Sequence, residues 1–441
     1  MTNELKGKVN YSVNGNIAIL EVDNPPVNPL SSGVRAGLSE YIAKANNDAS
    51  IEGIILTGAG RSFIAGADIS EFGQKPDGPD LHTALKEIEF SKKPVLAAIN
   101  GTALGGGLET ALVCNYRMGT NKAIVGLPEV NLGLLPGAGG TQRLPRLIGP
   151  SQALKMMIAG TPMSAKKALQ QGVIDAISEN SLMDDAVAFL QEKIELNLNE
   201  HPKVRDKNEK VLEARGDDNV LSEAKALAAK TRRGQFAPGQ IIACVEAAIN
   251  EDDFDIGMKK ESEYFLECLI NPQREAMIHI FFGERAASKI SDIPKETPLL
   301  PINSAGIVGS GTMGGGIAMN FANAGIPVLV LDQDEKNLER GMGVIEKNYQ
   351  MMVDRGRMTE EQKDMVLGLI TPTLSYEDLS DVDIAVEAVY ENLELKQEIF
   401  KSLDTVTKDH AILASNTSGL DIDAIASATN RPGKVVGTHF F

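Results

Sequence analysis

The sequence predicts an α/β protein of 441 residues, in two folded parts joined by a helical extension and a linker. This length exceeds that of most single domains, so more than one hydrophobic core is expected. From residue 16 to about 177, short apolar runs alternate with helical stretches, which is typical of layered α/β folds. Beyond residue 303, a strand, a glycine-rich turn, a helix and a second strand form one βαβ unit.

Local composition predicts each element in turn. Strands are expected at 17–22, 53–56 and 94–99, where apolar residues cluster in short runs. Helical periodicity dominates from 182 to 290, and its last part is predicted to be a packing helix interrupted near Asn271 and Pro272. Prolines among charges after residue 291 are typical of a linker. The expected parts are residues 1–180, a helical extension and linker at 181–300, and residues 301–441.

The acidic composition limits the classes of partner. A formal net charge of −17 argues against nucleic-acid binding, because phosphates would call for a basic face. The three cysteines and five histidines form no ligand-like pattern, so neither a metal site nor a disulfide framework is indicated. No apolar run is long enough for a transmembrane segment. We expect a soluble protein with no metal, no nucleic-acid partner and no membrane span.

A triple glycine marks the first candidate site. Residues 101–111 read GTALGGGLETA, and Gly105, Gly106 and Gly107 are expected to open a helix. Three consecutive glycines are costly to order, which suggests that a ligand approaches the backbone closely. The free N–H groups and the positive dipole end of a helix suit an oxyanion. Glu109 falls in the first turn, where a role as a partner of the helix dipole is equally compatible with the local sequence.

Two further runs complete this constellation. Glu129 follows Pro128 in GLPEVNLGLLPGAGGTQRLPRLIG, residues 126–149, and taken alone would be an ordinary surface residue. The turn RSFIAGADI, residues 61–69, follows a predicted strand and can supply one more backbone N–H group. In this order and spacing, the three runs resemble the enoyl-CoA hydratase (crotonase) family over about residues 10–177.

The resemblance implies a crotonase-like fold, a ββα spiral, and acyl-CoA thioesters as substrates. It places the paired catalytic glutamates at Glu109 and Glu129, and the N–H groups of the oxyanion hole at Ala65 and Gly106. Water adding to an α,β-unsaturated thioester puts negative charge on the thioester oxygen, which two N–H groups can stabilise. One carboxylate takes a proton from water and the other delivers one to the α-carbon. With both glutamates present, hydration is expected, with Δ3,Δ2-enoyl isomerisation as a side activity.

Coenzyme A is polyanionic, so local positive charge is expected near the substrate. Arg61, Lys92 and Lys93 are candidates, although a solvated surface position is preferred for each of them.

A dinucleotide fingerprint marks the second candidate site. The run GSGTMG follows a predicted strand at 305–308 and opens a helix, and a second strand follows at 327–331. This context matters because GxGxxG alone is a weak signal. Asp332 ends the second strand, where an acid binds the ribose 2′-hydroxyl and excludes a 2′-phosphate, so NAD is predicted over NADP. The predicted cofactor-binding residues of the fingerprint are Gly309, Gly311, Thr312, Met313 and Gly314.

Three later runs, at 382–404, 414–420 and 437–441, resemble the NAD-binding domain of the 3-hydroxyacyl-CoA dehydrogenases. That resemblance implies a Rossmann-type, doubly wound parallel sheet. Read without the family, His439 is an ordinary strand residue and Ser418 a turn former. The resemblance implies cofactor contacts at Glu391, Lys396 and Asn416, with Asn416 and Ser418 positioning the hydroxyacyl group and nicotinamide, and His439 as general base.

The chain stops at Phe441, where the dehydrogenase family continues with a glutamate that pairs with the histidine and a helical domain that closes over the substrate. We therefore expect a truncated dehydrogenase region that holds NAD weakly and shows little dehydrogenation.

Both resemblances on one chain, with the runs PPVN, FAPGQ and FFGERAASK, are similar to the multifunctional β-oxidation enzymes of the peroxisomal type 1 and of bacterial fatty-acid oxidation complexes. The predicted function is hydration of trans-2-enoyl-CoA to 3-hydroxyacyl-CoA, with coenzyme A as part of the substrate. The bacterial type implies a cytoplasmic location and, for the complexes, a thiolase subunit as partner; a peroxisomal location is the alternative. A catalytically silent CoA- and NAD-binding protein and an interaction module remain open as other classes.

Overall fold

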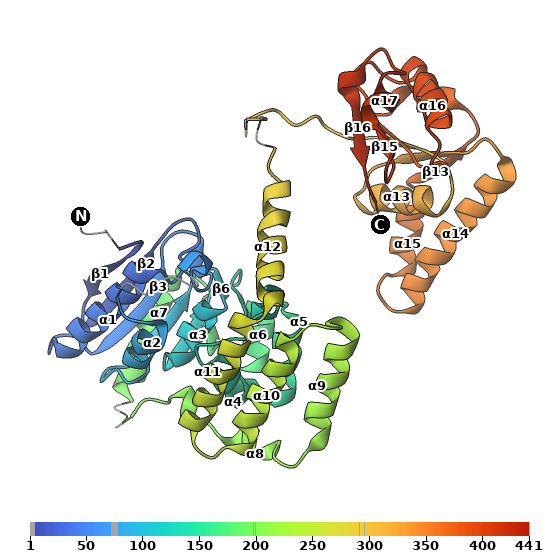
Figure 1. Cartoon of the computed structure of the whole chain (residues 1–441). Coiled ribbons are helices and arrows are strands. Elements are labelled where there is room, and N and C mark those ends of the chain that lie inside the picture. The colour runs from blue at the N-terminus through green and yellow to red at the C-terminus, as the bar shows by residue number, and fades with distance from the viewer. Residues whose placement is uncertain are drawn as a thin grey trace. The chain divides into compact units, whose positions relative to one another are not determined.

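A computed structural model describes residues 5–71, 78–196, 198, 200–290, 292–294 and 296–440 (Figure 1). Phe441, the last residue of the run at 437–441, lies outside the described residues. The chain folds into two compact units, Met1–Ile290 and Ser291–Phe441. Each unit has hydrophobic clusters of its own.

A six-stranded sheet forms the first layer of unit 1. Its strands, in sheet order, are β1 (Lys8–Asn14), β2 (Ile17–Asp23), β3 (Gly53–Gly58), β5 (Val95–Ile99), β7 (Tyr116–Gly119) and β10 (Ala176–Ile177). The β1–β2 pair is antiparallel and the other pairs are parallel. β3 and β5 are buried along their whole length, as expected for parallel strands covered on both faces.

Helices cover both faces of this sheet. One face packs into the main core with helices α1 (Ser32–Asn47) and α2 (Leu81–Glu89). On the other face, Ala186 and Leu190 of helix α7 (Leu182–Glu195) join a cluster with strand residues such as Ile55. The large sheet therefore serves as the rigid layer on which the rest of unit 1 is built.

A second, smaller sheet contains the short strands that precede the candidate site. In sheet order they are β4 (Ser62–Ile64), β6 (Thr102–Leu104), β8 (Ile124–Gly126) and β9 (Met163–Ser164). β4, β6 and β8 run parallel to one another, so their carboxyl ends lie along the same edge. Helix α3 (Gly106–Val113) follows β6 and is buried at all its residues. These strands of two or three residues were not predicted from the sequence, because they are too short to show a period.

The remaining helices of unit 1 lie in or after the site loops, and those from η3 onward, like α7, belong to the helical extension. They are η1 (Ile69–Glu71), η2 (Glu129–Leu132), α4 (Gly140–Ile148), α5 (Pro150–Ala159), α6 (Ala165–Gln171), η3 (Val204–Asp206), α8 (Glu209–Glu213), α9 (Asp218–Thr231), α10 (Ala237–Asn250), α11 (Phe254–Ile270) and α12 (Pro272–Ala287). The helix break predicted near Asn271 is confirmed, since Asn271 caps α12 through its side chain. The predicted packing role fits α11. In α12, which is described throughout, no residue is fully buried, although the helix lies against η2.

Unit 2 is a six-stranded sheet in which every pair of strands is parallel. Its sheet order is β13 (Ile370–Thr373), β12 (Val328–Leu331), β11 (Ala305–Val308), β14 (Ile384–Glu387), β15 (Ile412–Asn416) and β16 (Val435–Thr438). The helices are α13 (Thr312–Asn323), α14 (Glu335–Asp354), α15 (Glu360–Leu367), η4 (Tyr376–Asp381), α16 (Leu393–Val406), α17 (Ile422–Ala426) and η5 (Pro432–Lys434). α13 and α14 pack into one cluster and α16 into another, so the sheet is doubly wound.

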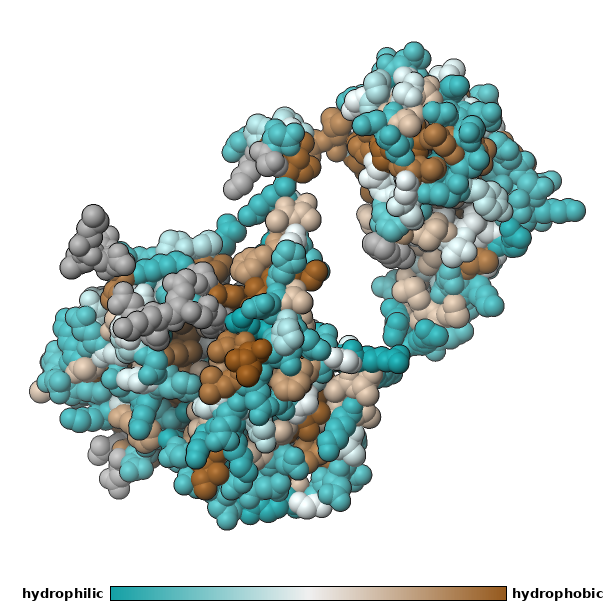
Figure 2. All heavy atoms as spheres, viewed as in Figure 1, coloured by the Kyte–Doolittle hydropathy of each residue, from teal (hydrophilic) through white to brown (hydrophobic). Residues whose placement is uncertain are grey.

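The predicted α/β class is confirmed in both units. Figure 2 shows a face on which hydrophilic residues predominate, with smaller apolar areas between them. Across the described residues, no helix has both the length and the apolar composition needed to cross a bilayer. Within the same residues, no group of histidine, cysteine, aspartate or glutamate side chains is arranged to hold a metal ion.

Candidate active site

The first candidate site forms where three loops leave neighbouring parallel strands. The GADI loop (residues 66–69) follows β4, Gly105 and α3 follow β6, and Glu129 follows β8. Carboxyl ends of parallel strands meet at one edge of a sheet, so segments distant in sequence converge there. Gly105 shows how tightly they meet: with φ 54°, it places an imagined Cβ 3.1 Å from Glu129 Oε1. A side chain at Gly105 would be strained and would also crowd the carboxylate.

Glu109 lies in the first turn of α3 with 3% of its surface exposed. Its Oε1 accepts hydrogen bonds from the amides of Ala138 at 2.7 Å and Gly140 at 2.8 Å. Burial raises the pKa of Glu109, while these two amides and the positive charge of Arg143 oppose the rise. The two backbone hydrogen bonds favour the ionised form of Glu109 against the effect of burial.

Glu129 begins η2 and is half-buried as a residue, but its Oε2 atom is buried. Among the described residues, no group donates a hydrogen bond to this oxygen. Burial, followed by the negative charge of Glu109, raises the pKa of Glu129 well above its usual range. The two glutamates predicted from sequence therefore lie close enough to interact, and the pair favours a state in which one of them keeps a proton.

A third buried carboxylate, which sequence analysis missed, belongs to Glu261 of α11. No part of its surface is exposed. Its Oε1 accepts from the amide of Gly139 at 2.7 Å, and its Oε2 accepts from the amide of Thr141 at 3.1 Å. Burial, then the charge of Glu109, raises the pKa of Glu261 to about 8. The available signal was an acidic residue on the otherwise apolar face of a predicted packing helix.

The backbone donors correct one sequence prediction. Gly106 is the first residue of α3, so its amide has no partner within the helix. Ala65 was predicted as the second donor, but its amide donates to the carbonyl of Val27 at 3.1 Å and is not available. The amide nitrogen of Ala67 instead lies 3.4 Å from the position of an imagined Cβ on Gly106. Among the described residues, no acceptor is bonded to the Ala67 amide.

The physical reason for the correction is the path of the chain after β4. A parallel bridge joins Leu30 to Ala67, and the amide of Leu30 donates to Gly66 O at 2.9 Å. This anchor turns the amide of Ala65 toward the loop that contains Val27 and leaves that of Ala67 beside Gly106. Two alanines, separated by one glycine, could not be distinguished by sequence pattern.

A buried ion pair supplies positive charge behind the carboxylates. Arg143 of α4 binds Glu89 of α2 through two hydrogen bonds, Nε to Oε1 at 2.8 Å and Nη2 to Oε2 at 2.6 Å. Both side chains are almost fully buried. The guanidinium also lies over the ring of Phe254, at the start of α11. Two parallel bonds to one carboxylate fix the guanidinium plane, so Arg143 is held near Glu109 and Glu261.

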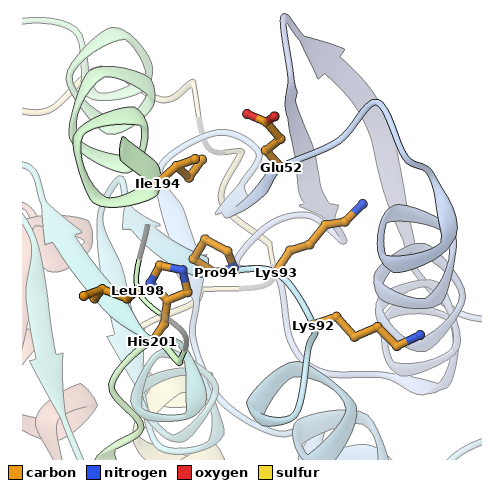
Figure 3. Close-up of a pocket in the computed structure, with 7 residues that line it drawn as sticks. All are labelled: Glu52, Lys92, Lys93, Pro94, Ile194, Leu198 and His201. Atoms are coloured by element: carbon orange, nitrogen blue, oxygen red, sulfur yellow. The ribbon is translucent and has the colours of Figure 1, made fainter. Parts of the chain in front are cut away.

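The lysines considered as coenzyme A contacts lie elsewhere. Lys92 and Lys93 line a surface cavity of about 290 Å³. Figure 3 shows their side chains directed away from His201, which also lines it. Glu52 and Pro94, which also line it, precede β3 and β5, so this cavity lies at the amino ends of those strands. The ammonium of Lys93 donates to the carbonyls of Ala45 and Asp48 at the end of α1. None of the predicted catalytic residues lines this cavity.

A second cavity, of about 300 Å³, lies beside the GADI loop. Ile69 lines it from the loop, and Arg274, Ile278 and Phe282 line it from α12. Arg274 Nε is buried and, within the described part of the chain, has no hydrogen-bond acceptor. The cavity therefore combines apolar side chains with one buried guanidinium N–H that has no acceptor, while Nη2 of the same Arg274 pairs with Glu275, which also lines the cavity, at 3.4 Å.

In unit 2, the predicted fingerprint lies at the carboxyl end of β11. A Cβ on Gly309, whose φ is 105°, would lie 2.7 Å from Ala388 O, and one on Gly314 would lie 1.8 Å from Gly309 O. Those two glycines permit close packing of helix and strand. A Cβ on Gly311, at the start of α13, would meet no described atom within 4 Å. The exposed residues Gly311 and Thr312 thus leave open space in front of free helix amides, which fits the pyrophosphate of a dinucleotide.

Asp332 lies where the fingerprint requires an acid. Its Oδ2 accepts from the amide of Ser310 at 3.0 Å and from the hydroxyl of Ser310 at 2.7 Å. The hydrogen bonds from Ser310 and from nearby backbone outweigh its burial and lower the pKa of Asp332. The carboxylate is therefore ionised and fixed beside the glycine-rich turn.

The remaining predicted residues of unit 2 gather at the ends of β14, β15 and β16. Ser418 Oγ lies 2.9 Å from His439 Nε2, and Asn416 Oδ1 accepts from the amide of Phe440 at 3.0 Å. Glu391 Oε1 accepts from the amide of Ser418 at 3.0 Å. Side chains predicted from separate runs are therefore brought together at one edge of the sheet.

Lys396 requires a correction. It was predicted as a cofactor contact, but none of its surface is exposed. Its ammonium donates to both oxygens of Glu387, at 2.7 and 2.9 Å, and lies 3.5 Å from Glu391 Oε2. A fully enclosed ammonium cannot touch a ligand, so Lys396 supports Glu391 from beneath the site.

Comparison with known proteins gives two family matches. The model of the enoyl-CoA hydratase/isomerase family matches residues 12–233, and that of the 3-hydroxyacyl-CoA dehydrogenase NAD-binding domain matches residues 304–441. The peroxisomal bifunctional enzyme of Cavia porcellus is 39% identical over 433 residues, which cover 96% of this chain and 59% of that protein. The human enzyme of the same name is 39% identical over 434 residues, with the same coverage.

A bacterial relative is similar to the same extent. The fatty acid oxidation complex subunit alpha of Shewanella putrefaciens (strain CN-32 / ATCC BAA-453) is 38% identical over 445 residues, covering 96% of this chain and 62% of that subunit. The chain thus spans about 60% of the length of these relatives.

Proposed function

The chain belongs to the enoyl-CoA hydratase/isomerase family and carries the NAD-binding domain of the 3-hydroxyacyl-CoA dehydrogenases after it, and we propose that unit 1 hydrates trans-2-enoyl-CoA thioesters in fatty-acid β-oxidation. The observation that supports this most strongly is the interacting pair of Glu109 and Glu129 beside the amides of Ala67 and Gly106. Hydration needs a base, an acid and an oxyanion site within reach of one substrate.

The proton roles follow from the environment of each carboxylate. Two amides bond to Glu109 and stabilise its anion, so Glu109 acts as the base that takes a proton from water. Glu129, whose pKa is raised by burial and by Glu109, retains a proton and acts as the acid. The water oxygen bonds to C3, its proton passes to Glu109, and the proton of Glu129 passes to C2. The product is a 3-hydroxyacyl-CoA.

The thioester oxygen gains negative charge during this addition. The amides of Gly106 and Ala67 are proposed to donate hydrogen bonds to it, with Ala67 in place of the predicted Ala65. Loss of one such donor typically costs about 2.7 to 4 kcal/mol. The cavity lined by Ile69 and Arg274 is proposed to admit the polyanionic coenzyme A portion, because Arg274 offers a buried donor there.

Three consecutive parts of the chain are proposed to have different functions. Residues 1–180 carry the hydratase core, residues 181–300 the helical extension and linker, and residues 301–441 the NAD-binding domain. NAD, when bound, supplies an acceptor for the hydride of the 3-hydroxyl carbon. The space in front of Gly311 and the ionised Asp332 support its binding. The residues proposed to hold the cofactor are Gly309, Gly311, Thr312, Met313, Gly314, Asp332, Glu391 and Asn416.

In the dehydrogenase reaction, His439 is proposed to accept the proton of the substrate hydroxyl. Ser418, 2.9 Å from the ring nitrogen of His439, would orient both the hydroxyl group and the imidazole. The 3-hydroxyacyl-CoA made in unit 1 is the substrate that this chemistry requires. The chemistry proposed for unit 2 is therefore the step that would follow hydration.

A side activity, a location in the cell and a partner subunit are also proposed. Δ3,Δ2-enoyl isomerisation is proposed as a side activity, since the same amides and carboxylates can stabilise and reprotonate an enolate. If the bacterial relationship holds, a cytoplasmic location and a thiolase subunit as partner are proposed. If the relationship to the peroxisomal enzymes holds, a peroxisomal location is proposed. Identities of 38% and 39% do not favour either relationship. Co-purification of a thiolase with the natural chain would support the bacterial type.

The deciding experiment is hydration of enoyl-CoA thioesters of several chain lengths, followed by loss of the absorbance of the conjugated thioester. Glu109→Gln and Glu129→Gln should each abolish turnover, while Glu87→Gln, an exposed position on α2, should not. Binding of acyl-CoA by calorimetry without turnover would favour a catalytically silent binding protein. Absence of both binding and turnover would favour an interaction module.

A further inference from the structure

The loop at residues 138–141, which runs into the first two residues of α4, is held between two carboxylates that come from different parts of the chain. Its amides alternate: those of Ala138 and Gly140 donate to Glu109, and those of Gly139 and Thr141 donate to Glu261. The hydroxyl of Thr141 donates to Glu261 as well. Because neighbouring amides point in opposite directions, the loop cannot shift toward one carboxylate without breaking bonds to the other.

Further contacts fix the position of this loop relative to the helical extension. Gln142 donates through Nε2 to Thr141 Oγ1 at 3.0 Å and to the carbonyl of Cys244 at 2.9 Å. A Cβ on Gly257 of α11 would lie 2.2 Å from Gln142 Oε1, so α11 passes very close to α4. Glu261 therefore approaches the loop on a helix that is itself closely packed against it.

We propose that Glu261 is a positioning residue for hydration: by holding the amides of Gly139 and Thr141, it aims those of Ala138 and Gly140 at Glu109. This inference rests on the hydratase function proposed above. Glu261 lies beyond residue 233, where the match to the hydratase family ends. The helical extension consequently contributes a functional group to the hydratase site as well as apolar packing.

The charge of Glu261 also affects the pair formed by Glu109 and Glu129. The titratable and charged groups that face it are Glu109 on α3, Glu129 on η2, Arg143 on α4 and Cys244 on α10. When Glu261 ionises, its negative charge raises the pKa of Glu129, which then holds its proton to higher pH. Removing the ionisable group should therefore let Glu129 lose its proton at lower pH.

The experiment compares Glu261→Gln and Glu261→Ala with the parent chain. Glutamine keeps an acceptor for the Gly139 amide but presents a donor to the Thr141 amide and cannot ionise. Glu263→Gln, on an exposed position of the same helix, is the matched control. Measured quantities are kcat and KM for enoyl-CoA hydration, the pH profile of kcat/KM, and hydrogen exchange of the segment 138–141 by mass spectrometry.

The expected result separates positioning from simple folding stability. We expect kcat to fall about tenfold in Glu261→Gln and about a hundredfold in Glu261→Ala, with KM within about twofold of the parent, because misaligned catalytic groups lower turnover. The alkaline limb of the kcat/KM profile should move to lower pH in Glu261→Gln. Exchange at 138–141 should increase in both variants, and Glu263→Gln should match the parent in every measurement.

The outcomes distinguish the two claims. A parent chain that does not hydrate any enoyl-CoA overturns the proposed function. A parent that hydrates, with a Glu261→Gln variant unchanged in kcat and in pH profile, leaves the function intact and overturns the role of Glu261. Equal losses in the glutamine and alanine variants, with an unshifted pH profile and a lower unfolding temperature, would also overturn it, because they indicate general destabilisation.

Discussion

Replacing Gly106 with alanine tests the proposed oxyanion site with a single methyl group. A Cβ at this position would lie 3.1 Å from Leu30 Cδ1 and 3.4 Å from the amide nitrogen of Ala67. An oxygen that accepts from the Ala67 amide must lie about 2.7 to 3.2 Å from that nitrogen. The methyl group would therefore occupy the approach of the thioester oxygen. Loss of one oxyanion donor costs about 2.7 to 4 kcal/mol, which lowers kcat by roughly 10² to 10³.

The same substitution should leave unit 1 folded. Leu30 Cδ1 is the end of a flexible side chain and needs to move by a few tenths of an ångström, which limits the cost of overpacking to about 1 kcal/mol. Alanine is preferred to glycine within a helix by about 0.5 to 1 kcal/mol, which offsets this cost. The unfolding temperature should therefore change by less than about 4 °C.

Two other glycines serve as controls for Gly106→Ala. A Cβ on Gly107 would lie 1.9 Å from the carbonyl oxygen of Ile64, a backbone atom that cannot yield, so Gly107→Ala should unfold the unit. A Cβ on Gly239 of α10 meets no described atom within 4 Å, so Gly239→Ala should be active and slightly stabilised. The assay is enoyl-CoA hydration by absorbance, with thermal unfolding by circular dichroism. Parental kcat in a folded Gly106→Ala variant would refute the oxyanion assignment.

Three further predictions follow from buried groups. Lys396→Met should lower the stability of unit 2 by roughly 3 to 5 kcal/mol, because it leaves Glu387 buried without its cation. Thermal unfolding is the measurement, and Lys401→Met, at an exposed position of the same helix, is the control. The cysteines Cys114, Cys244 and Cys268 are buried, and burial raises the pKa of Cys114 and of Cys268 to about 12. An aromatic disulfide reagent at mildly alkaline pH should therefore label none of the three thiols until guanidinium unfolds the chain. Labelling of the native protein at the rate of a free thiol would contradict this. Burial raises the pKa of Glu261 from 4.5 to about 8. Its contribution to the free energy of unfolding is therefore fully present below the unfolded pKa of 4.5 and is lost as pH rises through about 8. Chemical denaturation should show a smaller fall in stability between pH 4.5 and 8 for Glu261→Gln than for the parent, and parallel curves of stability against pH would contradict a raised pKa.

Much of the candidate site could be predicted because its signals are local. Glu109 lies four residues from Gly105 at a helix start, and the fingerprint at 309–314 combines a strand end, a tight turn and a helix start. Chain geometry over a few residues fixes such features, so sequence pattern suffices to find them. Ser418, His439 and Asn416 were assigned only through the resemblance to the dehydrogenase family, since local sequence alone makes Ser418 a turn former and His439 an ordinary strand residue.

The sequence by itself determined the α/β class and the fingerprint, because periodicity, turn residues and motif spacing are properties of neighbouring residues. The two glutamates were assigned through the resemblance to the hydratase family, since neither is distinctive in its local sequence. Only the tertiary structure shows that the amide of Ala65 is bonded to Val27, that Lys396 is enclosed and that Glu261 approaches the loop at 138–141. Each of these depends on which distant segment supplies the hydrogen-bond partner: Val27 for Ala65, Glu387 for Lys396, and Gly139 for Glu261. A local pattern carries no information about which distant segment packs against it, and the path of the folded chain settles that choice.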